Sequence, residues 1–159
     1  MAGPEKSKRL QIIDRVKTVL KNIVAGDSYN YTPYDVVKGP LDDSRLKGYP
    51  TYGVKVIPGG EIVEYLDQQN AEAFIIAVWG KLQDRDDVTT PLENAIRDVR
   101  KAITDDFKPA AGAGSLGTLA TDVRIEAPPD MAYEYGDIGF FGIFIQPIRV
   151  QTFGEFGEI

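Results

Sequence analysis

The sequence predicts an α+β fold in which two helices pack on a mainly antiparallel sheet of about four to five strands. Two segments, 7–25 and 90–107, carry apolar residues at helical spacing. The other segments are rich in β-branched and aromatic residues bounded by Gly and Pro, which is typical of strands. Because the elements follow in the order α-β-β-β-α-β-β without a linker, we expect residues 1–159 to form a single domain.

The first helix is predicted from a wide apolar stripe that runs from Leu10 to Val24. Ser7 can cap its N-terminus, and Gly26 stands where a glycine often ends a helix. Residues 1–25 hold six basic and two acidic residues, whereas residues 126–159 hold six acidic residues and one Arg. Such an asymmetry could orient neighbouring copies or partners electrostatically.

The next stretch, 27–53, contains five Tyr together with several Pro and Gly. We expect a short extended piece near 29–37 and a loop excursion at 38–48. Long loops in compact domains are usually functional or mobile. Tyr is favoured at protein interfaces, since it brings area and a hydroxyl at low entropic cost. Core and edge-strand packing is the alternative explanation for this stretch.

Three strands are predicted after it. A strand at 52–57 and a return strand at 62–66 are joined by a Pro-Gly-Gly turn. A second turn at 67–70 leads into 73–79, which is apolar on both faces and is therefore expected to be central. The short links predict an antiparallel meander.

The second helix begins with a predicted capping box, in which Thr90 is the cap, Pro91 takes the first helical position and Glu93 closes the box. Its apolar stripe runs from Leu92 to Phe107, with Asp98 expected on the outward side. Pro109 is expected to end this helix.

The last part of the chain predicts a flexible loop at 110–119 and strands at about 121–127 and 138–150. Pro147 inside the final strand implies a sheet edge or a bulge. Residues 151–159 are expected to form an extended C-terminal tail.

Composition restricts the possible chemistry. The chain has no His and no Cys, which excludes Ser-His-Asp triads, Cys nucleophiles and His- or Cys-ligated zinc. A formal net charge of −6 disfavours general nucleic-acid binding. No apolar run is long enough to span a membrane, and the basic N-terminus lacks the apolar core of a signal peptide. We therefore expect no membrane contact and assembly in a cytoplasm.

The motifs that could carry chemistry are weak. Asp84, Asp86 and Asp87 could hold Mg²⁺ or Ca²⁺, but a solvated turn before a helix is the simpler interpretation. The stretch 112–117 has the spelling G-x-G-x-x-G, but a helix precedes it and a strand follows, which is the reverse of a dinucleotide site. Glu61 and Glu64, three residues apart on a strand, would face opposite sides. We therefore expect no catalytic residue, cofactor or metal.

Contact residues are the best-supported candidates. The residues expected at an interface are Tyr29, Tyr31, Tyr34, Arg45, Tyr49, Tyr52, Phe153 and Phe156. The two Phe residues of the tail could dock on a neighbouring molecule or lack fixed structure.

From Tyr49 to Val150 the chain resembles the tail terminator (tail completion) proteins of long-tailed phages. The stretches that carry the resemblance are Tyr49-Pro50-Thr51-Tyr52, Gly59-Gly60-Glu61, Ala77-Val78-Trp79-Gly80, the acidic link from Asp84 to Asp87, the helix from Leu92 to Ile103, and Leu116 to Arg124. A Tyr-x-x-Gly stretch then precedes the last long strand, and the first helix fits the N-terminal helix of the family. Each stretch is weak by itself, and the order and spacing carry the comparison.

The resemblance implies a virion protein of the tail or neck, without catalytic groups, that forms a homo-hexameric ring. Such a ring ends polymerisation of the major tail tube protein and offers a surface to the head-tail connector. A sheath protein would be a further partner if the tail contracts, and DNA would only pass through the lumen, where an acidic lining avoids binding it. The alternatives are another neck or tail component, a carboxylate-dependent metal-binding enzyme, and a monomeric binding module that uses the tyrosines.

Overall fold

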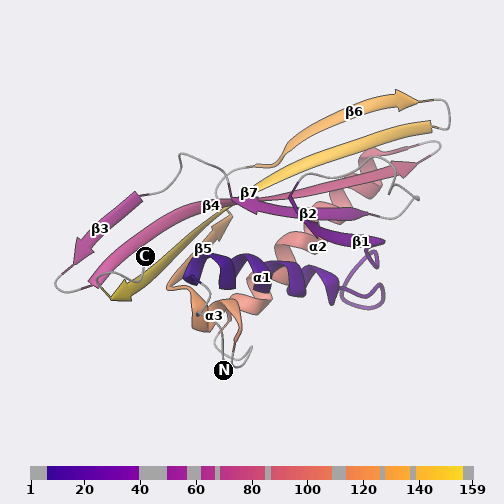
Figure 1. Cartoon of the computed structure of the whole chain (residues 1–159). Helices are drawn as coiled ribbons and strands as arrows, with labels where there is room; N and C mark the ends of the chain where they lie inside the picture. Colours follow the sequence, from indigo (N-terminus) through magenta and orange to yellow (C-terminus); the bar gives the residue numbers. More distant parts are fainter. Residues whose placement is uncertain are drawn as a thin grey trace, which may run out of the picture.

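The computed structural model describes residues 7–39, 50–56, 62–66, 69–84, 87–108, 114–125, 128–136 and 139–155. Together they form one mixed sheet of seven strands with three helices, which confirms the predicted α+β class (Figure 1). The helices are α1 (Lys8–Lys21), α2 (Thr89–Phe107) and α3 (Leu116–Leu119). The strands are β1 (Asp35–Lys38), β2 (Thr51–Val56), β3 (Ile62–Leu66), β4 (Gln69–Asp84), β5 (Asp122–Ile125), β6 (Asp130–Gly136) and β7 (Gly139–Glu155).

Two long strands, β4 and β7, form the axis of the sheet and cross the whole molecule in Figure 1. They pair antiparallel along the full length of β4, from Gln69 opposite Glu155 to Asp84 opposite Phe140. The predicted strand 73–79 is therefore extended at both ends. Gln69, which we expected in a turn, already pairs with Leu66 of β3.

The predicted meander is wrong, because β2 and β3 do not pair with each other. Both lie along the same edge of β4, where β2 pairs with residues 76–81 and β3 with residues 69–73. The strand β1 adds to β2 in parallel, which makes the sheet mixed. A long central strand thus replaces the succession of hairpins that the short links suggested.

The other side of β7 also carries two strands. β5 pairs with residues 148–151, and β6 pairs with residues 139–145. β6 was not predicted as a separate strand. Residues 151–155 of the predicted tail belong to β7 and pair with β4, whereas residues 156–159 lie outside the described part of the chain.

Pro147 lies opposite Ala77 of β4 and in the interval of β7 that neither β5 nor β6 pairs with. On that side the strand has a local edge. A residue without an N–H is tolerated there because no ladder bond is required. The prediction of an edge at Pro147 is confirmed, although the strand as a whole is central.

The helix ends follow the predictions at the start of α1 and at the end of α2, which ends at Phe107 with Lys108 as its C-cap, directly before position 109. Ser7 caps α1 and accepts a hydrogen bond from the backbone N–H of Leu10 at 3.2 Å, but the C-terminal cap is Asn22 rather than Gly26. At α2 the predicted capping box is wrong: the N-cap is Val88, without a side-chain cap bond, and Thr90 lies inside the helix. Part of the loop expected at 110–119 forms α3.

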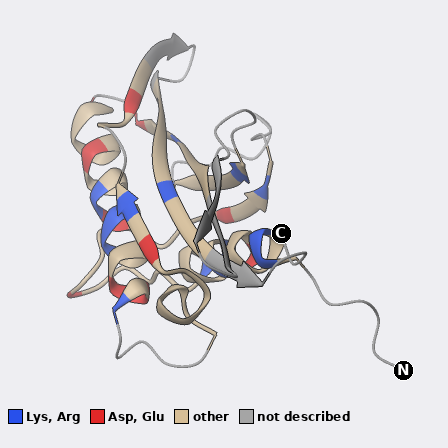
Figure 2. Ribbon diagram, turned by 90° about the vertical axis from the view of Figure 1, so that its left-hand side faces the viewer, with Lys and Arg blue, Asp and Glu red and all other residues tan. Residues whose placement is uncertain are grey.

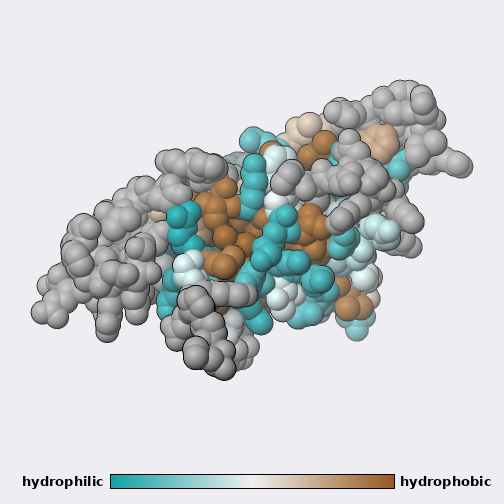
Figure 3. Space-filling view, viewed as in Figure 1, coloured by the Kyte–Doolittle hydropathy of each residue, from teal (hydrophilic) through white to brown (hydrophobic). Residues whose placement is uncertain are grey.

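The core lies between the helices and one face of the sheet. Between residues 74 and 82 of β4 and between residues 142 and 152 of β7, the residues at even positions are buried on the side of α1 and α2, and those at odd positions stand on the other face. The largest fully buried side chains are Tyr52, Phe74, Phe144, Ile12, Leu20, Ile23, Ile76, Leu82, Leu92, Ile103, Leu116 and Ile148. On the side that includes α1, Figure 3 shows hydrophobic surface interrupted by hydrophilic side chains.

Gly80 lies at the centre of this core, between two large aromatic side chains. The sheet register places it directly between Tyr52 of β2 and Phe144 of β7. The ring centroids of Tyr52 and Phe144 are 6.2 Å apart, and the two rings meet edge to face. A Cβ at position 80 would stand 2.0 Å from Phe144 Cε1, so the aromatic packing requires a glycine here.

We predict that Gly80→Ala lowers the free energy of unfolding by about 1–3 kcal/mol, because the added methyl group must displace a fully buried ring. Urea denaturation measures this change. Gly26→Ala is the matched control, since an added Cβ there meets nothing within 4 Å. The control should change stability by less than about 0.5 kcal/mol. Equal losses in the two variants would contradict the packing argument.

A half-buried ion pair joins the three helices. The guanidinium of Arg15 on α1 donates two hydrogen bonds to Asp106 on α2, Nε to Oδ2 at 2.9 Å and Nη2 to Oδ1 at 2.6 Å. The backbone N–H of Leu116, the first residue of α3, also donates to Oδ2 at 2.9 Å. Burial opposes ionisation of Asp106, but these donors hold the pKa of its carboxyl below the ordinary value.

We predict that Asp106→Asn lowers the free energy of unfolding at pH 7 by about 2 kcal/mol, because charge-assisted hydrogen bonds are lost. A depressed pKa stabilises the fold above the unfolded value of about 3.9, and this contribution is lost as the pH falls through the lower folded pKa. The difference between wild type and variant should therefore shrink below about pH 4.

Asp105→Asn is the control, because Asp105 makes its ion pairs with Lys101 and Lys108 at the surface. It should lose much less stability at pH 7. Denaturant titrations of both variants at several pH values make the comparison. A constant difference between wild type and Asp106→Asn down to pH 2 would contradict the assignment.

Candidate contact surfaces

The tyrosine segment is fixed to α2 by one buried carboxylate. Asp98, which is 1% exposed, accepts hydrogen bonds from the backbone N–H groups of Asn30 and Tyr31 and from the Asn30 side chain, at 2.9–3.0 Å. The sequence placed Asp98 on the outward side of the helix, which is wrong. Its spacing from Leu92 and Ala95 would have shown that it shares their face. The loop before β1 is therefore held in one place.

This anchoring presents part of the tyrosine segment to solvent. Tyr31 and Tyr34 line a shallow hollow of about 470 Å³ together with Ala25, Asn30, Thr32 and Pro33. The side chain of Tyr34 is 45% exposed. Tyr29 and Tyr31 are both half-buried and pack against the core, and Lys101 Nζ lies 5.6 Å from the ring centre of Tyr29. Tyr34 is therefore the most exposed of the three tyrosines, and Tyr31 shares its hollow.

The remaining predicted contact residues are placed as follows. Tyr52 is 0% exposed, so its prediction as an interface residue is wrong for the folded chain. Burial, with a smaller effect of the Asp98 and Tyr31 charges, raises the pKa of Tyr52 above its ordinary value. The backbone of Phe153 lies in β7 opposite Ala71. Arg45, Tyr49 and Phe156 lie outside the described residues.

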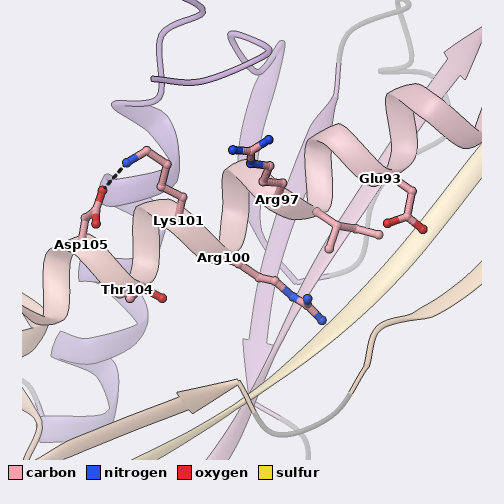
Figure 4. A pocket seen from close by; sticks show the side chains of 7 residues that line it. Glu93, Arg97, Arg100, Lys101, Thr104 and Asp105 are labelled. Carbon is pink, nitrogen blue, oxygen red and sulfur yellow. Dashed lines mark hydrogen bonds and ion pairs between the residues drawn. The ribbon is translucent and has the colours of Figure 1, made fainter. Parts of the chain in front are cut away.

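The outer side of α2 forms a second, polar surface. A hollow of about 360 Å³ is lined by Glu93, Ile96, Arg97, Arg100, Lys101, Thr104 and Asp105. Figure 4 shows Arg97 and Arg100 extending from opposite sides of the helix. Arg100 Nε donates to Gln146 Oε1 on β7 at 2.8 Å, and Lys101 is paired with Asp105. Figure 2 shows cationic and anionic residues alternating along α2, at the left, which indicates a solvated helix face.

Sequence reasoning missed a further candidate surface. The described helices pack on one face of the sheet, and the odd positions from 73 to 83 of β4 and from 141 to 151 of β7 stand on the opposite face, which we call the helix-free face. Its half-buried apolar members are Ile75, Trp79, Phe141, Ile143, Ile145 and Pro147, around the buried Ala77. The apolar run at 73–79 predicted a central strand with both faces buried, and this prediction concealed the surface.

Basic and acidic residues both lie around the apolar centre of the helix-free face. The charged residues with described side chains at these positions are Asp35, Lys55, Lys81, Asp122, Arg124, Asp130 and Arg149. Arg124 and Asp122 pair with each other at 2.6 Å, and Lys55 Nζ lies 4.8 Å from the ring centre of Trp79. The register also gives Glu64, Glu134 and Glu155 positions on this face, so the face is mixed in charge. Apolar area with an aromatic centre and a charged rim is the usual composition of a protein interface.

The acidic link before α2 has a structural explanation within the described chain. The Asp84 carboxylate accepts a hydrogen bond from the backbone N–H of Asp87 at 3.0 Å, and the Asp87 carboxylate accepts one from the N–H of Thr89 at 2.9 Å. Asp86 lies outside the described residues. Among the residues that the structure describes, no three acidic side chains come close enough to hold a metal ion.

We predict that Tyr52→Phe leaves the free energy of unfolding unchanged or raises it by up to about 1 kcal/mol. Within the described part of the chain, the Tyr52 hydroxyl is buried without a hydrogen-bond partner, so its removal relieves a desolvation cost. Thermal and urea unfolding measure the effect. If the variant loses more than about 1 kcal/mol, the hydroxyl has a partner and the assignment is wrong.

The comparisons give no relative from which a function could be transferred. No model of a known protein family matches the chain, and no curated protein has a similar sequence. None of the helices in the described part of the chain is long and apolar enough to cross a membrane.

Proposed function

We propose that this protein is a structural subunit that assembles head to tail into a ring, and that the ring is a phage tail terminator. It would sit on the last ring of the tail tube, stop polymerisation of the major tail tube protein and offer a docking surface to the head-tail connector. The residues would supply contact surfaces and no catalytic step. DNA would pass through the lumen without being bound.

The observation that carries the proposal is the helix-free face of the sheet. A row of apolar side chains in the middle of a sheet is normally covered by a second layer, because large exposed apolar patches are rare on monomers. Here the described helices are all on the other face, so a neighbouring molecule would supply the missing layer. The hydrophobic centre and the polar rim suit a protein partner better than a small substrate.

The order of the helices and strands along the chain supports the more specific proposal, which is that the ring is a tail terminator. The described stretches that carry the family resemblance fall on β2, the C-terminal half of β4, α2, α3 with β5, β6 and β7, whereas Tyr49 and Gly59-Gly60-Glu61 lie outside the described residues. Another neck or tail component with a related fold would present the same elements, so the partner decides between these alternatives. The carboxylate-dependent enzyme is a weaker proposal, because Asp84 and Asp87 already accept backbone hydrogen bonds.

We predict that the purified protein forms rings, and that purified tail tubes bind them at the tube end. Light scattering after size exclusion gives the stoichiometry, and negative-stain microscopy shows the rings. In a polymerisation assay of the major tail tube protein, its addition should halt tube growth. A strict monomer at high concentration, both alone and with tubes, would contradict the ring.

Variants of the tyrosine segment provide a second measure of assembly. The double variant Tyr31→Ala with Tyr34→Ala removes both aromatic side chains of the hollow. The double variant Lys17→Ala with Lys21→Ala also truncates two side chains, on α1, and is the comparison. The tyrosine variant should raise the concentration at which rings form by more than the lysine variant does. Equal or reversed effects would remove the tyrosine segment from the interface.

A further inference from the structure

The sheet ends in two short strands that have one neighbouring strand each. The strand order is β1-β2-β4-β7-β5, so β1 and β5 are the outermost strands along this path (Figure 1). Within the described chain, no strand pairs with the outer side of either one. Both are four residues long. Because an edge strand carries backbone N–H and C=O groups that can pair with another chain, the two edges are candidate sites for strand addition.

The two edge strands run in opposite directions. β1 is parallel to β2, which is antiparallel to β4. β5 is antiparallel to β7 and therefore runs in the same direction as β4. A rotation about an axis that follows the strands preserves every strand direction and keeps the helices on one side of the sheet. Such a rotation brings β1 of one copy beside β5 of the next copy as an antiparallel pair.

Alternate residues of β1 belong to different faces of the sheet. Val36 is buried in the core, and Lys38 forms an ion pair with Asp14 of α1 at 2.6 Å, so both lie on the side of the helices. Asp35 and Val37 therefore stand on the helix-free face. The Asp35 carboxylate accepts a hydrogen bond from the backbone N–H of Val36 at 2.8 Å, which holds it close to the edge strand.

On β5 the same alternation places the charged residues on the helix-free face. Val123 and Ile125 pack against the core, so Asp122 and Arg124 have the opposite orientation. The Arg124 side chain is 71% exposed and forms an ion pair with Asp122. Arg149 of β7 stands directly opposite Arg124 and is a second cation on this face. This part of the β5 edge therefore carries two positive charges and one negative charge.

Charge decides the register in which the two edges can pair. Residues that lie opposite each other in a sheet share a face, so Asp35 can oppose either Asp122 or Arg124. The first register brings two carboxylates together, and like charges directly opposite each other are destabilising. The second register gives a pair of opposite charge. It also balances the local charges, since Asp35 and Asp122 then accompany Arg124 and Arg149.

The same register matches apolar side chains on the side of the helices. Val36 then lies opposite Val123, and Tyr34 lies opposite Ile125. Tyr34 directly precedes β1, and its backbone N–H donates to the carbonyl of Pro50 at 2.8 Å, so its backbone continues the line of the strand. Its side chain is 45% exposed in the single chain, and a neighbouring β5 would cover it. Aromatic and β-branched cross-strand pairs of this kind stabilise sheets.

Other pairings of these edges satisfy fewer of the conditions. β6 also lies on the outer side of β7, but its register gives Asp130 and Glu134 positions on the helix-free face, where they would oppose Asp35. β5 could pair with β5 of another copy, because Asp122 of each would then oppose Arg124 of the other. That contact is symmetric, stops at a dimer and leaves β1 uncovered.

From these observations we propose that the outer edge of β1 in one copy pairs antiparallel with the outer edge of β5 in the next copy, with Asp35 opposite Arg124. Each copy then contributes two different edges, and the sheet continues from copy to copy. A contact between two different patches closes into a ring when the rotation between neighbours allows it. The inference rests on the proposed function in that both require self-association, and it adds which strands meet.

Charge exchange tests the register. We expect Asp35→Lys and Arg124→Glu, each alone, to raise the concentration at which the protein assembles at least about tenfold, because like charges then lie opposite each other. A chain that carries both changes should assemble near the wild-type concentration, since the pair is restored with reversed polarity. Asp27→Lys and Lys17→Glu, which lie outside the two edges, are the matched controls and should leave assembly unchanged. Light scattering over a dilution series measures the assembly concentration.

The absence of Cys from the chain allows a direct trap. Val37 and Asp122 lie opposite each other in the proposed register. We expect a chain with both Val37→Cys and Asp122→Cys to form a ladder of disulfide-linked multimers under mild oxidation, whereas equal amounts of the two single variants should stop at dimers. The pair Val37→Cys with Thr18→Cys is the control and should stay monomeric on a denaturing gel. Circular dichroism and thermal melting of every variant establish that the fold is retained.

A third cysteine variant detects the symmetric alternative. If β5 pairs with β5 of another copy, position 123 lies opposite itself, and Val123→Cys alone should give a disulfide-linked dimer. In the proposed contact Val123 lies opposite Val36, so this variant should stay monomeric on the gel. A dimer from Val123→Cys without a ladder from Val37→Cys with Asp122→Cys would overturn the proposed contact.

The outcomes separate this contact from the proposed function. If wild-type protein forms rings while the single charge variants assemble normally and the trap gives no ladder, the contact between β1 and β5 is wrong and the ring remains. If wild-type protein stays monomeric alone and with tail tubes, both proposals are overturned. Restored assembly in the double charge variant together with a ladder would establish the contact.

Discussion

The continuous pairing of β4 with β7 is the constraint on which the rest of the structure depends. Sixteen residues of each strand remain in register, and every other strand is attached to one of these two directly or through β2. Because the side chains of a strand alternate, this register also fixes which residues face the helices. A shift by one residue would turn Phe74 and Phe144 away from the core and bring Trp79 and Ile145 into it. The aromatic packing around Gly80 opposes that shift, since only a glycine fits between Tyr52 and Phe144.

Within the helical layer, a few polar contacts connect distant parts of the sequence. The Arg15–Asp106 pair joins α1 to α2 and orients α3, and Asp98 fixes the loop before β1. These carboxylates are buried, and each has two or more donors, which is the condition under which a buried charge is tolerated. The basic first helix therefore has one of its cations bound inside the molecule. Its free charges cannot be read from sequence composition alone.

Elements whose signals are local could be predicted from the sequence, and those that depend on partners could not. The two long helices, β2, β3 and the central part of β4 follow from periodicity and turn residues. The alternation of β4 is hidden by apolar side chains on both faces, so the sequence did not distinguish a strand between two layers from one with an open face. The burial of Asp98, and of the predicted contact residue Tyr52, depends on groups more than twenty residues away. The parallel pairing of β1 with β2 likewise has no local signature.

The register of β4 and β7 determines both faces of the sheet at once. The alternation that buries Phe74 and Phe144 under the helices also places the half-buried Trp79 and Ile145 on the helix-free face. In the proposed assembly, contacts between identical chains through two different patches either close into a ring or continue as a filament. The rigidity of the β4–β7 ribbon would then determine which occurs, because it fixes the angle between the two patches in every copy.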